Sequence, residues 1–209
     1  MDGVYDGIVS RHLNRRLSRP AARLLGHTPV TPNQVSVASL GVALGSFLCF
    51  AYGYPIAAAL LAQASSVLDG VDGDLARLKG LTSAFGGFMD AVIDRYTDAL
   101  IILGLTLWAA GDESSVTVWM TGFFALAGTF AVTYSRARIE GLPRSVFDRG
   151  ITSLASRDIR LLLIMVGALA GQGFSTLLVL ASLTNAVTLM RLVQARRLLG
   201  GTTAKERVS

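Results

Sequence analysis

The sequence predicts an all-α, polytopic membrane protein with six transmembrane helices and an N-terminal amphipathic helix at the membrane interface. Composition is the first observation: 52% of the 209 residues are apolar and only 16% are charged. A soluble domain of this length carries more charge, so the composition indicates a membrane protein. The lengths of the apolar stretches and the placement of the basic residues are the second and third observations.

Six apolar stretches follow the N-terminal arm, and most approach the ~20 residues needed to cross a ~30 Å hydrocarbon layer. The fifth stretch is short, and to cross a bilayer it must include the polar residues between Arg157 and Arg160 at its edge. The stretches cover residues 33–53, 55–76, 86–110, 115–136, 158–172 and 174–194.

The basic residues predict the orientation of these stretches. All 19 Lys and Arg residues lie in the N-terminal arm, the second and fourth connections, the C-terminal tail, or helix ends facing that same side. Because cytoplasmic loops carry an excess of Lys and Arg, we expect both termini in the cytoplasm and an even number of spans in the cell membrane. The same placement accounts for the net charge of +5 without a nucleic-acid partner.

The N-terminal arm mixes arginines with apolar residues at helical spacing, as Leu13, Leu17 and Leu24 illustrate. This pattern over residues 5–25 predicts a helix in the headgroup plane, bent or restarted at Pro20. An ordinary basic juxtamembrane arm would give nearly the same pattern. We therefore expect a cytoplasmic arm with an interfacial helix over 1–30, a six-helix transmembrane domain over 31–197, and a disordered cytoplasmic tail over 198–209.

Two pairs of aspartates lie inside the second and third apolar stretches. Asp69 and Asp72 are three residues apart near the cytoplasmic end of the second, and Asp90 and Asp94 are four apart near the start of the third. Both spacings put a pair on one helix face. The short connection makes the two helices antiparallel neighbours, so the pairs can face each other. Carboxylates within a membrane are expensive and mark a functional site.

Four converging carboxylates repel one another unless positive charge is supplied. Two divalent cations would supply it, and an all-oxygen ligand set without nearby His or Cys favours Mg²⁺, with Mn²⁺ next. Gly73 and Gly86 would let a bulky ligand approach the backbone, and Arg77 can bind phosphate oxygens with two donors. These residues favour phosphoryl transfer at the cytoplasmic face.

Other interpretations of the aspartates stay open on residues alone. Each aspartate could pair with Arg77, Arg95 or a helix terminus in a purely structural role. A cation-coupled transporter also keeps acids within its spans, although nearer the midplane and on interrupted helices. A non-catalytic membrane protein that binds a lipid or a nucleotide is a third alternative.

The segment from Asp72 to Asp94 resembles the signature of the CDP-alcohol phosphotransferase, or CDP-alcohol phosphatidyltransferase, family. Asp72-Gly73-Asp74-Leu75-Ala76-Arg77, eight residues, Gly86, three residues, Asp90, three residues and Asp94 fit D-G-x2-A-R-x8-G-x3-D-x3-D without a departure. Asp69 supplies the further upstream acid of family members. The resemblance covers nearly the whole chain and implies a six-helix, usually homodimeric membrane enzyme that releases CMP from a CDP-alcohol.

The resemblance also implies residue roles. Asp69, Asp72, Asp90 and Asp94 would bind two metal ions, and Asp94 would act as general base on the acceptor hydroxyl. Asp98 is not a fixed position of the signature and could pair with Arg95 or a buried polar group. The residues that would line the CDP-alcohol site are Pro32, Asn33, Gln34, Gly73, Arg77, Ser83 and Gly86.

The acceptor is predicted from arginines near the later stretches. Arg136, Arg157 and Arg191 each lie at or within an apolar stretch, where they could bind an anionic acceptor. The segment Tyr134–Gly141 resembles the basic motif after the fourth span of family members using inositol phosphate, with Arg136 where phosphatidylinositol-phosphate synthases often have Lys. The residues 156–160 and the opening residues 6–15 resemble the membrane domain of di-myo-inositol-phosphate-phosphate synthases. That membrane domain is often fused to a cytidylyltransferase, so activated inositol would here come from elsewhere.

We therefore expect phospholipid or inositol-phosphodiester synthesis with inositol phosphate as acceptor. Glycerol 3-phosphate and serine are alternative acceptors. The donor could be CDP-diacylglycerol, CDP-archaeol or CDP-inositol.

Overall fold

The computed structural model describes residues 15–111, 115–138 and 154–206, and within these ranges every regular element is a helix. Six of the seven described helices correspond to the six apolar stretches, which confirms the all-α class. The ends of these helices agree with the predicted ends to within a few residues, except that the last helix continues well past its apolar stretch. The helices are α1 (Arg15–Gly26), α2 (Pro32–Ala51), α3 (Pro55–Lys79), α4 (Ala84–Ala110), α5 (Val116–Ala137), α6 (Arg157–Leu169) and α7 (Gly173–Glu206).

Local chemistry sets the helix ends that surround the aspartates. Thr31 begins α2 with a capping box, in which its backbone N–H donates to Gln34 Oε1 (2.9 Å) and its hydroxyl accepts from the Gln34 backbone N–H. Gly80 ends α3 at a φ of 65°, a conformation that favours glycine. The Ser83 hydroxyl then accepts from the Gly86 backbone N–H (3.0 Å) to begin α4.

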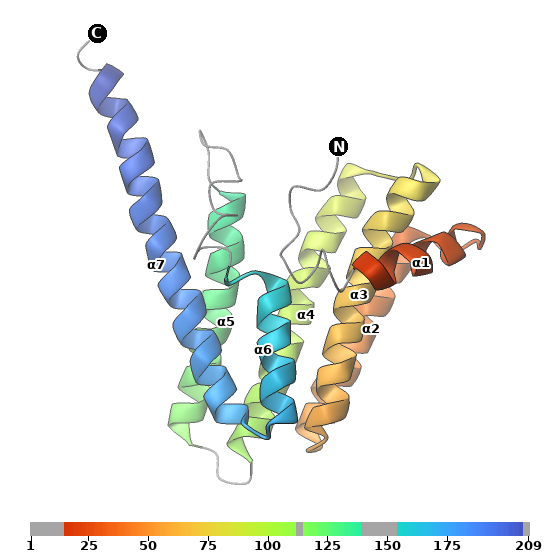
Figure 1. Cartoon of the computed structure of the whole chain (residues 1–209), viewed down its shortest axis with the longest axis horizontal. Helices are drawn as coiled ribbons and strands as arrows, with labels where there is room; N and C mark the ends of the chain where they lie inside the picture. The colour runs from red at the N-terminus through yellow and green to blue at the C-terminus, as the bar shows by residue number, and fades with distance from the viewer. Residues whose placement is uncertain (1–14, 112–114, 139–153, 207–209) are drawn as a thin grey trace.

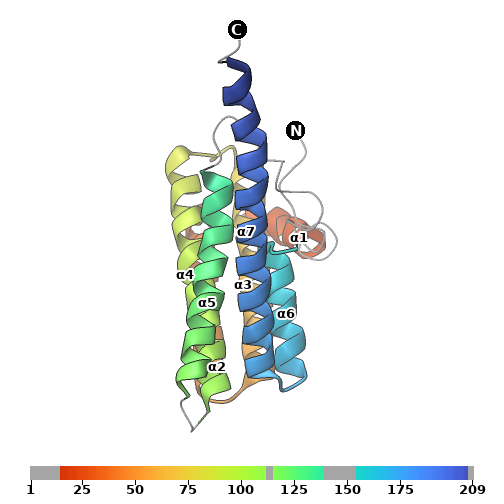
Figure 2. The ribbon, with the colours of Figure 1, turned by 90° about the vertical axis from the view of Figure 1, so that its left-hand side faces the viewer.

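Helix α2 packs against both α3 and α4, whereas α3 and α4 make few direct contacts with each other. We expected these two antiparallel helices to be close neighbours, and instead they diverge from their short connection along the sides of α2. Helix α6 packs on α3, and α5 packs on α7 (Figures 1 and 2). The largest buried cluster joins Phe50, Leu105, Ile164 and Leu180 from four helices.

The membrane character of the chain rests on its apolar helices. Three helical segments are long and apolar enough to cross a bilayer, namely Pro32–Ala51, Val116–Ala137 and Gly173–Leu198. The other three helices of the bundle are less clearly spans, because α3 and α4 carry the aspartates and α6 has only 13 residues. Large apolar side chains such as Phe123 and Leu178 face outward, as in membrane proteins.

Helix α1 lies crosswise to α3, and it runs through Pro20 without ending there (Figure 1). It covers the later part of the amphipathic helix predicted for 5–25, and residues 1–14 lie outside the described residues. The prediction of a disordered tail after Arg197 is wrong for 198–206, because α7 continues to Glu206. The helix-forming residues Ala195–Leu199 offer no stop signal, and α7 passes through the glycines that follow.

Candidate active site

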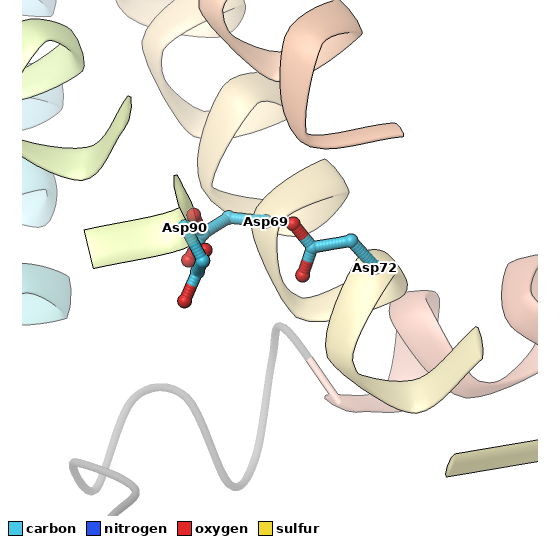
Figure 3. Close-up of side chains that lie close together, drawn as sticks. All are labelled: Asp69, Asp72 and Asp90. Atoms are coloured by element: carbon cyan, nitrogen blue, oxygen red, sulfur yellow. The ribbon is translucent and has the colours of Figure 1, made fainter. Parts of the chain in front are cut away.

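Three of the four predicted aspartates lie together. Carboxylate oxygens of Asp69 and Asp72 on α3 and of Asp90 on α4 all lie within 4.8 Å of one another (Figure 3). The spacing of three residues brings the first two onto one face of α3, as expected.

The surroundings of these aspartates fit a cation. Ser36 on α2 donates a hydrogen bond to Asp72, which is only 6% exposed. One oxygen of Asp69 and one of Asp90 are buried without a hydrogen-bond partner among the described residues. Buried polar atoms in proteins nearly always have a partner. A hard divalent ion such as Mg²⁺ or Mn²⁺, which prefers oxygen ligands, would satisfy both atoms.

Asp94 does not join this group of three in the structure. It accepts a hydrogen bond from Arg157 at the start of α6, and it lies 3.5 Å from an amino nitrogen of Arg95. Arg157 also pairs with Asp69 at 2.7 Å. Arg157, which the sequence suggested for the acceptor pocket, therefore lies among the acids and links α6 to α3 and α4.

A buried ion pair lies next to Arg157. Asp98 and Arg160 are 4% exposed each and pair at 2.9 Å, and Arg160 also donates to the Ala155 carbonyl. A carboxylate oxygen of Asp98 lies 3.5 Å from Arg157 Nε. The sequence predicts that Asp98 pairs with Arg95 or a buried polar group. Arg95 lies 3.6 Å from Asp98, and the buried polar partner is Arg160.

A cavity of about 180 Å³ opens beside Asp72 and Asp90. A methyl group added at Gly86 would lie 3.1 Å from the Ser83 hydroxyl and 3.6 Å from Asn33 Oδ1, so glycine keeps this part of the cavity open. Of the seven residues predicted for the CDP-alcohol site, six line the cavity: Pro32, Asn33, Gly73, Arg77, Ser83 and Gly86.

Gln34 is the seventh, and its side chain instead caps the start of α2. Ser36 lines the same cavity and was not predicted. Its position four residues after Pro32, one helical turn along, was the available signal.

Arg77 points partly away from this cavity. Its guanidinium donates to Asp74 (2.6 Å), and its side chain is 61% exposed. Asp74 also accepts from the hydroxyl of Ser18 on α1 (2.9 Å). The arginine of the signature is thus linked through Asp74 to the helix that crosses α3.

The three predicted acceptor arginines lie at different positions. Arg191 on α7 is buried and donates to the Val132 carbonyl and the Ser135 hydroxyl at the end of α5. Arg136 is half-buried in the last turn of α5. Of these three arginines, only Arg157 is described in contact with the aspartates. Residues 139–141 of the segment that resembles inositol-phosphate enzymes lie outside the described residues.

Comparisons with known proteins point to one family. The sequence model of the CDP-alcohol phosphatidyltransferase family matches residues 29–190. A bifunctional IPC transferase and DIPP synthase of Rubrobacter xylanophilus is 42% identical over 92% of this chain and 43% of that protein. An archaetidylinositol phosphate synthase of Aeropyrum pernix is 31% identical over 92% of this chain and 94% of that protein. The chain thus spans less than half the length of the bifunctional relative and nearly all of the second.

A solved structure shares the fold. Phosphatidylinositol phosphate synthase of Mycobacterium tuberculosis with CDP-DAG bound has a TM-score of 0.71 at 22% identity, over 87% of this chain and 94% of that one. The same protein has also been solved in complex with manganese and citrate, with a TM-score of 0.70. The family match spans every aspartate described above, and two relatives are at least 31% identical over 92% of this chain. This chain belongs to the CDP-alcohol phosphatidyltransferase family.

Proposed function

We propose that this protein transfers a substituted phosphate group from a CDP-alcohol to an acceptor alcohol, in a reaction that needs a divalent metal and releases CMP. Family membership makes the chain a transferase of phosphate-containing groups and favours the enzyme over the transporter. The observation that carries the proposal is the group of three carboxylates within 4.8 Å, at the edge of a cavity lined by the signature residues.

Asp69, Asp72 and Asp90 would hold the first divalent cation, and we propose Mg²⁺, with Mn²⁺ as an alternative. The two buried oxygens without described partners support this assignment. A second ion would also need Asp94, whose carboxylate here bonds to Arg157. Loading of the second ion therefore requires the Arg157 side chain to withdraw from Asp94. When bound, the metals would neutralise the donor diphosphate and polarise its phosphoryl oxygens.

The other residues of the cavity would bind the donor. Gly73 and Gly86 leave space for the cytidine and diphosphate, and Arg77 has exposed donors that could turn onto a phosphate. Pro32, Asn33 and Ser83 line the same cavity from the starts of α2 and α4. Gln34, as a capping residue, would act indirectly by holding that start in place.

The chemical step forms one bond and breaks one. The acceptor oxygen attacks the β-phosphorus of the CDP-alcohol, and the bond from that phosphorus to the CMP oxygen breaks. Asp94 would take the proton from the acceptor hydroxyl as general base once Arg157 has released it. Arg77 would share the charge that develops on the transferring phosphate.

We propose inositol phosphate as the acceptor. Two of the proteins named above, from Aeropyrum pernix and Mycobacterium tuberculosis, are inositol phosphate synthases by name. The Tyr134–Gly141 segment resembles that of family members using inositol phosphate. Arg136, Arg157 and Arg191 would recognise the acceptor phosphate, with Arg157 free to do so only after leaving the acids. Glycerol 3-phosphate and serine are the alternative acceptors.

We also propose the membrane arrangement. Helices α2 to α7 would form a six-span catalytic domain over 31–197, and α1 would lie on the cytoplasmic surface. Both termini would be cytoplasmic, the site would open to the cytoplasm, and the enzyme would be a homodimer. The exposed apolar side chains and the one-sided basic residues support this arrangement.

A CMP-release assay on purified protein tests the function. CDP-diacylglycerol, CDP-archaeol and CDP-inositol should each be crossed with inositol phosphate, inositol, glycerol 3-phosphate and serine, with and without Mg²⁺. We expect CMP only with metal, and the fastest release with inositol phosphate. Neutral inositol working equally well would overturn the acceptor assignment, and no CMP from any pair would overturn the proposed reaction.

A further inference from the structure

Helix α1 presents three different faces. Ser18 and Ala22 are buried against α3. Ser18 lies close to Gly70, because a methyl group added at Gly70 would lie 3.3 Å from the Ser18 Cβ. Leu17 and Leu24, on a second face, are 55% and 73% exposed. The third face carries arginines, all of them exposed: Arg16, Arg19 and Arg23.

A groove of about 310 Å³ lies where the arginine face of α1 meets α3. Its charged residues are Arg19 and Arg23 from α1 and Asp74 and Arg77 from α3, with Ala22 and Leu78 as the apolar part of its lining. Three guanidinium groups and one carboxylate give the groove an excess of positive charge. Such an excess is typical of sites that bind phosphate.

The single carboxylate is already committed. Asp74 accepts from Arg77 on one side and from Ser18 on the other. The negative charge of Asp74 is therefore directed at Arg77. It compensates the positive charges of Arg19 and Arg23 less than that of Arg77. Because Ser18 is buried and anchors α1 to α3, the two α1 arginines are held beside Arg77 at a defined place.

We propose that this groove is a second phosphate site, which shares Arg77 with the donor cavity but is otherwise lined by different residues, and that it binds the phosphate of an anionic membrane lipid. The exposed Leu17 and Leu24 would sit in the interface, which puts the groove at the depth of lipid headgroups. The inference goes beyond the catalytic proposal and uses only its membrane placement of α1. A soluble phosphate offers the same chemistry, so the test must separate the two sources.

The test uses the full chain in phosphatidylcholine nanodiscs, with phosphatidylglycerol added in increasing fractions. Native mass spectrometry counts bound phosphatidylglycerol, and a fluorescent phosphatidylglycerol gives its apparent Kd. The test variant is Arg19→Gln with Arg23→Gln. The control is Arg16→Gln, which removes one charge from the same helix outside the groove and is matched to the single variant Arg23→Gln.

We expect the double variant to weaken phosphatidylglycerol binding about 25-fold, since each basic residue near a membrane surface contributes about one factor of five. The Arg16→Gln control should lose at most about fivefold, and all three proteins should share one Tm in pure phosphatidylcholine. Equal losses in the double variant and the control would overturn the site. If the double variant were unstable, the single Arg23→Gln protein would carry the same comparison.

An arm with inorganic phosphate distinguishes the sources. Failure of phosphate to displace the fluorescent lipid from wild type supports a lipid ligand. Displacement that the double variant no longer shows supports the groove with a soluble anion as its ligand. If wild type binds neither the lipid nor phosphate more tightly than the double variant does, the proposal is overturned. This holds whatever the CMP-release assay shows.

Discussion

Arg157 and Asp69 pair at 2.7 Å, and this contact joins the start of α6 to the acidic face of α3. The same guanidinium bonds to Asp94 on α4. An arginine thus occupies the position of a counter-ion between two carboxylates assigned to metal. If Asp94 also binds a second metal ion, as we propose, Arg157 and that ion would compete for it, and this competition can be measured.

Replacing Arg157 with Gln should destabilise the protein most when metal is absent. The change leaves Asp69 and Asp94 without their cation, and breaking one partner of a buried pair costs about 3–5 kcal/mol. Bound dications would replace the lost charge, so saturating Mg²⁺ should restore much of the Tm. Thermal unfolding with and without Mg²⁺ measures this.

Arg196→Gln is the control, because Arg196 is exposed near the end of α7. Its Tm should match wild type in both conditions. An Arg157→Gln protein that loses the same stability with and without Mg²⁺ would argue against competition between arginine and metal.

Replacing Asp98 with Asn should cost about 3–5 kcal/mol of unfolding free energy, because Arg160 would keep a buried charge with no full counter-charge. The double change Asp98→Leu with Arg160→Met should cost less than either single change. Unfolding of wild type, Asp98→Leu, Arg160→Met and the double variant forms a double-mutant cycle. Additive losses would show that the buried pair at 2.9 Å is not energetically coupled.

Replacing Gly86 with Ala should raise the KM for the CDP-alcohol by about tenfold while kcat falls less. The added methyl group would crowd Ser83 and Asn33 at the wall of the donor cavity, and lost uniform binding raises KM rather than lowering kcat. Gly41→Ala is the matched control, since a methyl group there meets nothing within 4 Å. An unchanged KM in the Gly86→Ala enzyme would place the donor elsewhere.

Replacing Ser36 with Ala should weaken metal binding without removing it. Ser36 holds Asp72 in place by donating to the oxygen Oδ2, and residues that orient metal ligands typically contribute 10–100-fold in affinity. A Mg²⁺ titration of CMP release gives the apparent affinity, and Tm checks the fold. Ser39→Ala, a change at a second buried serine of α2, is the control, and an equal effect there would assign the loss to packing.

Much of the fold could be predicted from the sequence because helix signals and apolar lengths agree. Pro32 and Pro55 stand at the first turns of α2 and α3, and Gly80 ends α3. These signals act within a few residues of the chain. The extent of α7 was missed because its end carries no stop signal before the glycines, through which the helix continues.

The candidate site shows the same division between local and distant contacts. Helical spacing put Asp69 beside Asp72, and the signature identified the cavity-lining Gly73 and Gly86. The pairing of Asp94 with Arg157 depends on how α6 packs beside α3, and no spacing within one helix encodes that contact. Gln34 was assigned to the donor site because of its place in the chain, yet the capping box occupies its side chain.

The proposed function depends on Asp69, Asp72 and Asp90 as ligands of a divalent metal. Mn²⁺ binding to chelator-treated protein, followed by electron paramagnetic resonance, tests this most directly and needs no substrate. We predict saturable binding by wild type and a loss of at least tenfold in affinity for Asp90→Asn, with the Tm of the metal-free protein maintained. Mn²⁺ binding that is equally tight in Asp90→Asn, or absent from folded wild type, would contradict it.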